Sequence, residues 1–174
     1  MPDYYRLPLG PSAPRVVNAV IEIQKGSHLK IEYDAMLGVF ALDRVLSSAM
    51  IYVVDYGFLP STLAGDGDPA DVLVMVDEPS FPGCFMPVRP IGMMVMEDDG
   101  EDYKILCVPD GDKRFDDIHD LSDVAAHRLR EIEHFFKAYK TLEEKFPEVA
   151  GWRGAAEAYA YVEKCRDAFT AGTT

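Results

Sequence analysis

Cysteine is scarce in this sequence, and its spacing indicates no metal site. Cys84, Cys107 and Cys165 are far apart, and no Cys-x-x-Cys pair occurs, so a zinc centre of the usual spacing is not supported. An odd number of separated cysteines is typical of free thiols in a reducing compartment. We therefore expect buried, unpaired thiols in a cytoplasmic protein.

Long apolar runs are missing as well. No stretch approaches the roughly 18 residues that a membrane-spanning helix needs, and no basic segment followed by an apolar one opens the chain. We therefore expect neither membrane contact nor a secretory signal. The sequence also lacks the Gly-x-x-x-x-Gly-Lys-Ser/Thr phosphate loop and the Gly-x-Ser-x-Gly nucleophile turn.

Positive charge is in short supply. The chain has 17 Lys and Arg against 30 Asp and Glu, a formal net charge of -13. A protein this acidic repels a phosphate backbone, so we expect no nucleic-acid partner. The excess carboxylates either form a solvated surface or are gathered to hold hard cations, which prefer oxygen ligands.

The pattern of the first two thirds is that of a β protein. A length of 174 residues with 48% apolar content is ordinary for one domain spanning residues 1–174. Short β-branched or alternating segments, separated by Gly, Pro and Asp, predict strands at residues 16–23, 28–34, 39–44, 50–54, 71–76, 86–97 and 103–108. Many short strands at close spacing are typical of a small barrel or sandwich.

The last third has helical spacing. One apolar stripe consists of Leu129, Ile132, Phe135, Phe136, Tyr139 and Leu142. We expect Ser122 to cap the start of this helix and Pro147 to end it. A second helix is expected at about residues 154–169. The predicted architecture is mainly β with flanking α-helices: one barrel domain with helices packed on its outside.

The sharpest motif is an acidic turn that enters a strand. Three carboxylates lie within six residues, in Asp66-Gly67-Asp68-Pro69-Ala70-Asp71. Carboxylates this close repel one another unless a cation neutralises them, although Asp, Gly and Pro also favour a plain solvated turn. An EF-hand loop fits poorly, because its sixth position should be Gly but is Asp71 and its twelfth should be Glu but is Asp77.

Two further groups of charged residues can likewise be interpreted either as part of a binding site or as ordinary surface charge. Residues 97–102 form a second acidic cluster, which is either a hairpin tip or a second set of metal ligands. Lys30 and Glu32 share one strand face, with Glu22 on the preceding strand. This group is either ordinary charge pairing or a cavity lined by both signs.

Further cations and phenols could hold a phosphate. Arg44, Lys104 and Lys140 would add positive charge, and a small anion held by metal ions and Arg or Lys is the general arrangement for phosphoryl transfer. The hydroxyls of Tyr56 and Tyr139 can donate to phosphate oxygens without adding charge. Tyr139 also continues the apolar stripe, which favours core packing.

Taken together, these segments resemble the family I soluble inorganic pyrophosphatases. The Asp-x-Asp-Pro-x-Asp signature of that family matches residues 66–71. Other matching segments occur in the family's order, namely Val20-Ile21-Glu22-Ile23, Lys30-Ile31-Glu32, Leu42-Asp43-Arg44, Tyr56-Gly57-Phe58, Asp102-Tyr103-Lys104 and His134-Phe135-Phe136-Lys137-Ala138-Tyr139-Lys140. The resemblance runs from about residue 8 to residue 169.

The resemblance implies a role for each matching residue. Asp68 would orient and deprotonate the attacking water, with Tyr56 as a second catalytic candidate. The implied metal ligands are Glu22, Glu32, Asp66, Asp71, Asp98 and Asp102. The implied pyrophosphate contacts are Lys30, Arg44, Tyr56, Lys104, Tyr139 and Lys140.

The resemblance also implies a fold, a cofactor and an assembly. The fold would be a closed five-stranded barrel of oligonucleotide-binding type with two C-terminal helices. The cofactor would be Mg²⁺, several ions per site, with Mn²⁺ or Zn²⁺ as substitutes. The substrate would be pyrophosphate, and the chain would form a cytoplasmic homo-oligomer, with a hexamer favoured.

Some departures and alternatives remain open. Ile31 and Val53 stand where relatives often carry Tyr and Pro, and the acidic turn at 97–102 is one residue shorter. Counting forward from Gly92 makes Asp98 the metal ligand, whereas counting back from Asp102 gives Glu97, and Asp99 is the third possibility. The competing functions are an inactive barrel, which the intact acids disfavour, and a cation-binding oligomer. The second gives no purpose to Lys30, Arg44, Tyr139 and Lys140.

Overall fold

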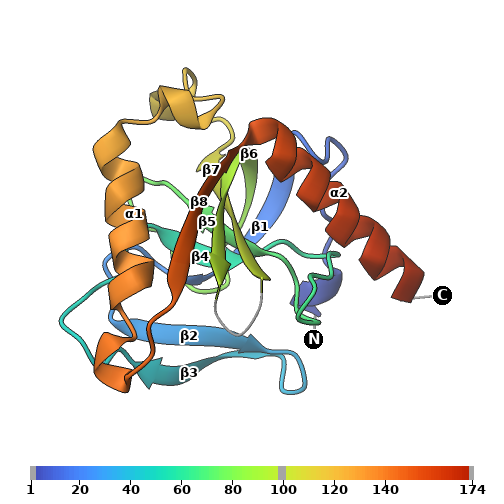
Figure 1. Cartoon of the computed structure of the whole chain (residues 1–174). Coiled ribbons are helices and arrows are strands. Elements are labelled where there is room, and N and C mark those ends of the chain that lie inside the picture. The colour runs from blue at the N-terminus through green and yellow to red at the C-terminus, as the bar shows by residue number, and fades with distance from the viewer. Residues whose placement is uncertain (1–2, 98–100, 173–174) are drawn as a thin grey trace.

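A closed ring of strands forms the centre of the molecule (Figure 1). The computed structural model describes residues 3–97 and 101–172. The ring runs in the order β1 (Val17–Ile23), β4 (Asp55–Phe58), β5 (Asp71–Val74), β7 (Glu101–Pro109) and β6 (Phe85–Glu97), and β1 pairs with β6 to close it. Neighbours are antiparallel except β5 and β7, which are parallel. A further strand, β8 (Glu148–Gly154), pairs with the second part of β6.

The ring strands are apolar on both faces because each face has its own core. In β5, Leu73 packs into one cluster with Phe135 and Phe136, whereas Val72 and Val74 pack into another. Successive side chains of a strand point to opposite sides, so one strand supplies both clusters. This explains why residues 72–74 are a continuous apolar run rather than an alternating one.

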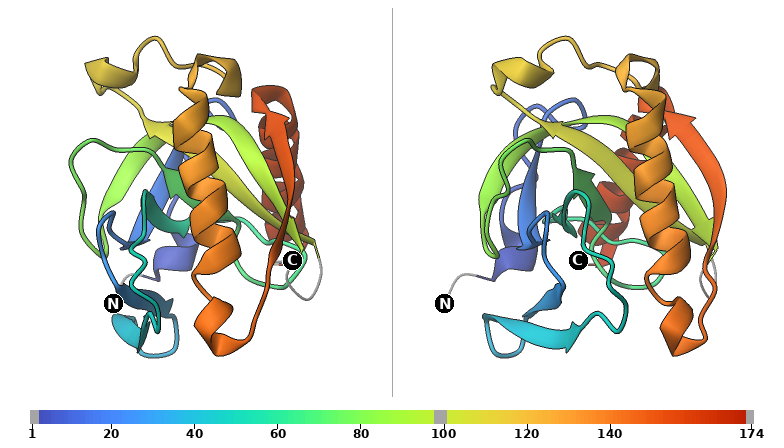
Figure 2. Two further views of the ribbon diagram at one scale, coloured as in Figure 1. Left: turned by 60° about the vertical axis from the view of Figure 1, so that its left-hand side comes forward. Right: turned by 90° about the vertical axis from the view of Figure 1, so that its left-hand side faces the viewer.

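Two helices cover the ring on opposite sides (Figures 1 and 2). The α1 helix (Ala126–Ala138) buries Ile132, Phe135 and Phe136. The α2 helix (Ala155–Gly172) buries Ala155, Ala158, Val162 and Cys165, and the last three belong to the second cluster. No helix in the described part of the chain is both long and apolar enough to cross a membrane.

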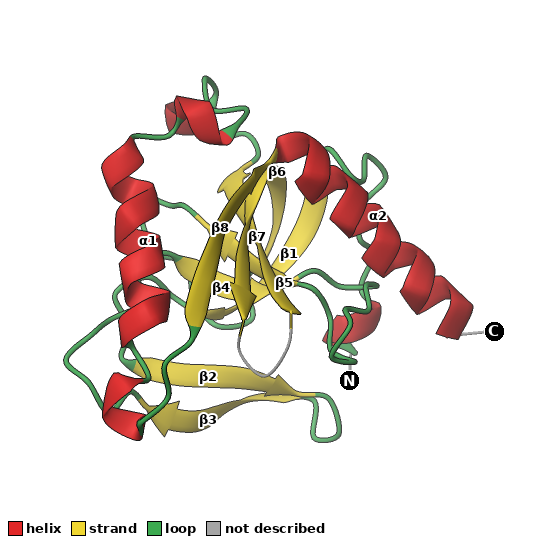
Figure 3. Ribbon diagram, viewed as in Figure 1, coloured by secondary structure: helices red, strands yellow, loops and turns green. Residues whose placement is uncertain are grey.

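A hairpin stands apart from the ring (Figure 3). Its strands are β2 (Leu29–Asp34) and β3 (Val39–Val45), which form a separate two-stranded sheet with Lys30 opposite Arg44. A buried contact ties it to the ring, because the Tyr33 N–H donates to Glu22 Oε1 at 2.7 Å. The five-stranded ring and the C-terminal helices confirm the expected fold class.

The predicted strand at residues 50–54 is wrong. Tyr52 and Val54 are buried, but the segment is a loop in which Tyr52 N–H donates to Ser27 O and Gly26 N–H donates to Tyr52 O. The strand begins one residue later, at Asp55. The segment is therefore apolar because the core covers it, not because it pairs in the sheet.

The predicted ends of the first helix are wrong as well. Ser122 lies in a separate 3-10 turn, η3 (Leu121–Asp123), and α1 begins after Ala125, which makes no side-chain cap hydrogen bond. The helix ends at Ala138 rather than near Pro147. A second 3-10 turn, η4 (Thr141–Glu143), follows it and leaves Leu142 69% exposed.

The structure differs from the sequence-based prediction at three further places. Strand β8 was not predicted, because its sequence is poor in β-branched residues and it owes its conformation to pairing with β6. Leu29 is exposed, since the hairpin packs on the ring only near Tyr33. The three cysteines are free, as expected, although Cys84 is only partly buried.

Candidate active site

A cavity of about 320 Å³ lies between the ring and the hairpin. Five carboxylates line it, and they come from β1, β2, the loop before β5 and the start of β5: Glu22, Glu32, Asp66, Asp68 and Asp71. We call Glu22, Asp66, Asp68 and Asp71 the acidic wall, because they are attached to the ring. Tyr56 lines the cavity as well, so the structure brings together six of the predicted site residues from distant parts of the chain.

The loop of the acidic wall is folded so that its carboxylates stay close. Gly67 has φ +95°, a left-handed conformation that glycine adopts without strain. The Asp68 N–H donates to Asp66 Oδ1 at 3.1 Å, and the Ala64 N–H donates to Asp68 O at 2.7 Å. Ala70 is fully buried and anchors the loop just before Asp71.

Burial and neighbouring negative charge raise the pKa values of two of these carboxyl groups. For Glu22, burial and, to a smaller extent, the Asp71 and Glu32 carboxylates raise the pKa to about 8 against the lowering effect of the Tyr33 N–H. Burial raises the pKa of Asp68 too, with Asp66 and Asp71 contributing. Such a group of acids gains stability when a cation shares the cavity with it.

Lys104 supplies a buried positive charge beside the acidic wall. It lies opposite Asp71 in the parallel pairing of β5 and β7. Its Nζ atom is 2.7 Å from Asp71 Oδ2 and 3.0 Å from Asp102 Oδ2, and it lies 5.4 Å from the centre of the Tyr56 ring. Burial opposes the charge, but Asp71 and Asp102 together hold the pKa of Lys104 above its ordinary value.

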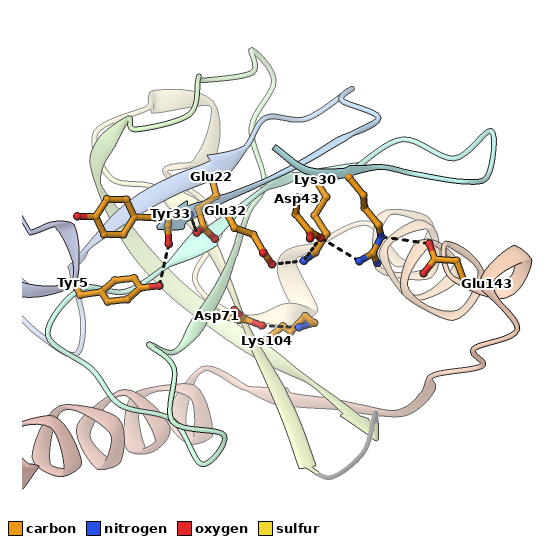
Figure 4. A network of polar contacts seen from close by, with 10 residues as sticks. Tyr5, Glu22, Lys30, Glu32, Tyr33, Asp43, Asp71, Lys104 and Glu143 are labelled. Atoms are coloured by element: carbon orange, nitrogen blue, oxygen red, sulfur yellow. Dashed lines mark hydrogen bonds and ion pairs between the residues drawn. The ribbon is translucent and has the colours of Figure 1, made fainter. Parts of the chain in front are cut away.

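The hairpin carries two more cations, each paired with acids (Figure 4). Lys30 contacts Glu32 and lies 3.2 Å from Asp43 Oδ2. Arg44 places Nη1 3.1 Å from Asp43 Oδ2 and Nε 3.4 Å from Glu143 Oε1. These predicted phosphate-binding groups therefore face carboxylates that an incoming anion would have to replace.

Tyr139 and Lys140 follow the end of α1 and do not line the acidic cavity. Tyr139 is 7% exposed and stacks on Phe135 with ring centres 5.0 Å apart. Lys140 Nζ lies 5.4 Å from the centre of the Tyr139 ring. Glu143, three residues further on, reaches Arg44. We call Lys30, Arg44 and Lys140 the cationic arm.

The second acidic cluster is only partly described. Asp102 contacts Lys104 and shares a small pocket with Asp66 and Asp71. Asp98 and Asp99 lie outside the described residues. The choice between Asp98, Asp99 and Glu97 as a ligand therefore stays a prediction.

The chemistry of this donor set fits divalent cations. Within the described residues, no group of three or more Asp, Glu, His or Cys side chains is gathered tightly enough to hold a metal as the side chains stand. Instead, the Lys104 ammonium lies between Asp71 and Asp102. The acidic wall nevertheless offers oxygen donors alone, which suits Mg²⁺ or Mn²⁺ and not a soft metal.

Three residues of the site were not predicted from the sequence. Asp43 and Glu143 pair with the cationic arm, and Tyr5, from η1 (Tyr4–Arg6), lines the acidic cavity. The Tyr5 ring packs on Tyr33 and Phe58, and its hydroxyl donates to Tyr33 O at 3.4 Å.

Burial, followed by the nearby Glu22 and Asp68 carboxylates, raises the pKa of Tyr5 to about 12, so the hydroxyl remains a donor. The Tyr4-Tyr5 pair was the available signal, since aromatic residues stand out in a segment rich in Pro and Gly. It could indicate packing but not the surface on which the pair packs.

Comparison with known proteins gives one consistent family. The chain matches the family model described as inorganic pyrophosphatase over residues 19–170. A curated inorganic pyrophosphatase of Nostoc sp. is 49% identical over 168 residues, which are 96% of this chain and 99% of the relative. One from Thermus thermophilus is 47% identical over 169 residues, 95% of this chain and 97% of the relative.

A solved structure agrees with these matches. The crystal structure of inorganic pyrophosphatase from Thermus thermophilus has a TM-score of 0.95 at 44% identity, and the match covers 97% of this chain and 99% of that one. Among the described residues that line the acidic cavity, Tyr5 alone precedes the span of the family model.

Proposed function

The chain belongs to the inorganic pyrophosphatase family and hydrolyses pyrophosphate to phosphate, and we propose that it does so between the acidic wall and the cationic arm. The observation that carries this assignment is the meeting of both signs of charge at one cleft, with Lys104 contacting Asp71. An inactive barrel and a purely cation-binding oligomer are not supported by the matches. We take residues 1–174 to be one catalytic domain.

Divalent cations are expected to be held by the carboxylates of the cleft. We assign Glu22, Glu32, Asp66, Asp71, Asp98 and Asp102 as ligands, some of them through water. Mg²⁺ is the expected metal, with several ions per site, and Mn²⁺ or Zn²⁺ are expected substitutes. When bound, such ions neutralise phosphate oxygens and lower the pKa of water.

Asp68 is assigned to the attacking water. It lies on the cavity wall, is exposed, and makes no ion pair with Lys104. The water oxygen bonds to phosphorus, the bridging P–O bond breaks, and the proton passes to Asp68. No phosphorylated side chain is needed, since the water attacks directly.

Tyr56 is assigned as an uncharged donor beside Asp68. Burial, followed by the Asp71 carboxylate, raises the pKa of the Tyr56 phenol. The hydroxyl therefore keeps its proton and can donate it in a hydrogen bond to a phosphate oxygen without adding charge to the cleft.

The cationic arm is assigned to the leaving phosphate. Lys30, Arg44, Lys104 and Lys140, with Tyr139, would stabilise the charge that collects on this phosphate as the bridging bond breaks. In the structure Lys30 and Arg44 are half-exposed and paired with acids. Breaking a partly solvated ion pair of this kind costs little free energy, so pyrophosphate can replace the carboxylates as the partner of Lys30 and Arg44.

A cytoplasmic homohexamer is the proposed assembly. Several apolar side chains are exposed on the isolated chain, including Met36 at 97% and Phe146 at 72%. Large exposed apolar side chains are common where subunits meet. Light scattering on the purified protein measures the mass directly, and a monomeric mass at micromolar concentration would contradict the proposal.

One assay tests the function. The purified chain should release phosphate from pyrophosphate with Mg²⁺, and excess chelator should abolish the release. Ca²⁺ should bind but inhibit, because it is larger and its coordination is looser. Turnover that persists undiminished in chelator would contradict the proposed role of the acidic wall.

A further inference from the structure

Glu143 joins two parts of the site that are otherwise built separately. It belongs to η4, directly after the segment that carries Lys140. Its Oε1 atom lies 3.4 Å from Arg44 Nε and accepts a hydrogen bond from Ser47 Oγ at 3.2 Å. Both partners belong to the hairpin side of the cleft, in β3 or just after it, and Figure 4 shows the Glu143 carboxylate turned toward this side.

The Glu143 carboxylate supplies the negative charge that faces Nε of the Arg44 guanidinium. Its Nε atom is shielded from solvent and has no well-aligned hydrogen-bond acceptor among the described residues. The Glu143 carboxylate, 23% exposed, is the charge that faces this atom. Asp43 faces Nη1 instead and also contacts Lys30. Asp43 therefore joins two residues within the hairpin, whereas Glu143 connects the hairpin to η4.

The backbone around Glu143 is held to Lys140 by a closed turn. The Glu143 N–H donates to Lys140 O at 2.9 Å, and the Lys145 N–H donates to the same oxygen at 3.3 Å. Glu144 closes the turn in a left-handed conformation with φ +57°. The position of the Glu143 carboxylate is therefore tied to the position of Lys140.

Strand pairing does not orient the hairpin, and the buried Tyr33–Glu22 hydrogen bond ties it to the ring at Tyr33 rather than at Arg44. Strands β2 and β3 pair only with each other, while Arg44 and Lys140 come from the hairpin and from the end of α1. Two cations that bind one phosphate must be held at a fixed spacing, and loss of that spacing costs rate or affinity.

We propose that Glu143 is a positioning residue that sets the place of Arg44 relative to Lys140 and so shapes the phosphate site of the cationic arm. The inference rests on the proposed function, since it takes Arg44 to bind phosphate. It differs from an ordinary surface ion pair, which would contribute little and would leave substrate affinity unchanged.

Isosteric removal of one charge is the direct test. Glu143→Gln should raise the KM for pyrophosphate about tenfold at saturating Mg²⁺, with kcat changed much less. Glu144→Gln is the matched control, because it removes an exposed charge at the next residue and should leave both constants unchanged. Thermal unfolding of both variants should match that of the unmodified chain.

A double-mutant cycle separates positioning from a general effect of charge. In the Arg44→Ala background, Glu143→Gln should change KM less than twofold, because the group through which it acts is gone. Equal effects of Glu143→Gln with and without Arg44 would overturn the proposal, as would an unchanged KM in the single variant.

The cycle also distinguishes this inference from the proposed function. If Arg44→Ala raises KM and Glu143→Gln does not, the positioning role fails while the proposed function stands. If Arg44→Ala itself has wild-type kinetics, the role of Arg44 and the inference fail together. Absence of Mg²⁺-dependent phosphate release from the unmodified chain would defeat the proposed function itself.

Discussion

We assign the acidic wall and the cationic arm to one active site, but the structure supports them in different ways. Glu22 and Asp71 are flanked in sequence by core residues, among them Ile21 and Val72, which are fully buried. In β3, by contrast, Leu42 is 57% exposed close to Arg44. The acidic wall is held by the packed ring, whereas Lys30 and Arg44 of the cationic arm are held by ion pairs on a partly exposed hairpin.

This difference suits the two tasks. Mg²⁺ demands near-ideal octahedral geometry, so its ligands benefit from strands that cannot shift without disturbing a close-packed core. Phosphate-binding cations must exchange one anionic partner for another when substrate enters. Half-exposed ion pairs allow this exchange at low cost, so the softer support of the cationic arm is compatible with its function.

The largest expected effect is on the acidic wall, at the residue assigned to the water. Asp68→Asn should lower kcat by about 10²–10⁴-fold because it removes the proton acceptor. The rate should not recover as Mg²⁺ is raised, since the metal ligands remain. Asp117→Asn, at an exposed position, is the control. Recovery of Asp68→Asn at saturating Mg²⁺ would make Asp68 a metal ligand instead.

The cationic arm should respond in KM rather than in kcat. Arg44→Ala removes one charge-assisted contact worth about 1.5–3 kcal/mol, so KM should rise roughly 10- to 100-fold. Steady-state kinetics at saturating Mg²⁺ measure it. Arg153→Ala, an exposed arginine in β8, should behave like the unmodified chain. Unchanged kinetics in Arg44→Ala would mean that this cation is only a surface group.

Lys104 belongs to neither set by definition but contacts Asp71 of the acidic wall, and its removal should lower the stability of the protein. Lys104→Met leaves Asp71 and Asp102 without their shared partner. Because both carboxylates are partly solvated, we expect the free energy of unfolding to fall by about 1–3 kcal/mol in chelator, and by less with Mg²⁺.

Urea unfolding with and without Mg²⁺ measures this difference. Lys137→Met, which removes an exposed lysine on α1, is the matched control and should cost much less. An equal loss of stability for Lys104→Met in both conditions would show that no cation approaches Asp71 and Asp102.

The smallest effect is expected at the aromatic edge of the acidic wall. Tyr5→Phe keeps the ring contacts with Tyr33 and Phe58 but removes a hydroxyl worth about 0.5–1 kcal/mol. The value of kcat/KM should fall about two- to fivefold. Tyr4→Phe is the control on the neighbouring ring. A loss of stability without any kinetic change would assign Tyr5 to packing alone.

Local patterns predicted most of the strands correctly but failed where packing overrides pattern. Residues 71–76 were predicted to form a strand, and residues 71–74 of them do. Residues 50–54 have the same apolar character and form a loop, because both kinds of segment are buried and burial alone does not specify pairing. The early end of α1 follows from the same limitation, since Tyr139 continues the apolar stripe after the helix has ended.

The sequence by itself was enough to indicate the family, and through that resemblance the roles proposed for the site residues. The acidic turn at residues 66–71, the alternation of Lys30 and Glu32 and the order of the matching segments needed no coordinates, because each is a local feature of the chain. The family and the proposed roles of Asp68 and Asp71 follow from them.

Only the tertiary structure decided which polar side chains from distant parts of the chain lie together. Ser47 and Glu143 lie 96 positions apart in the chain yet share a hydrogen bond, and Tyr5 reaches the acidic cavity from η1. Such contacts depend on how the hairpin and the chain end pack against the ring. That packing is set by the summed burial of many side chains, so no spacing within one segment encodes it.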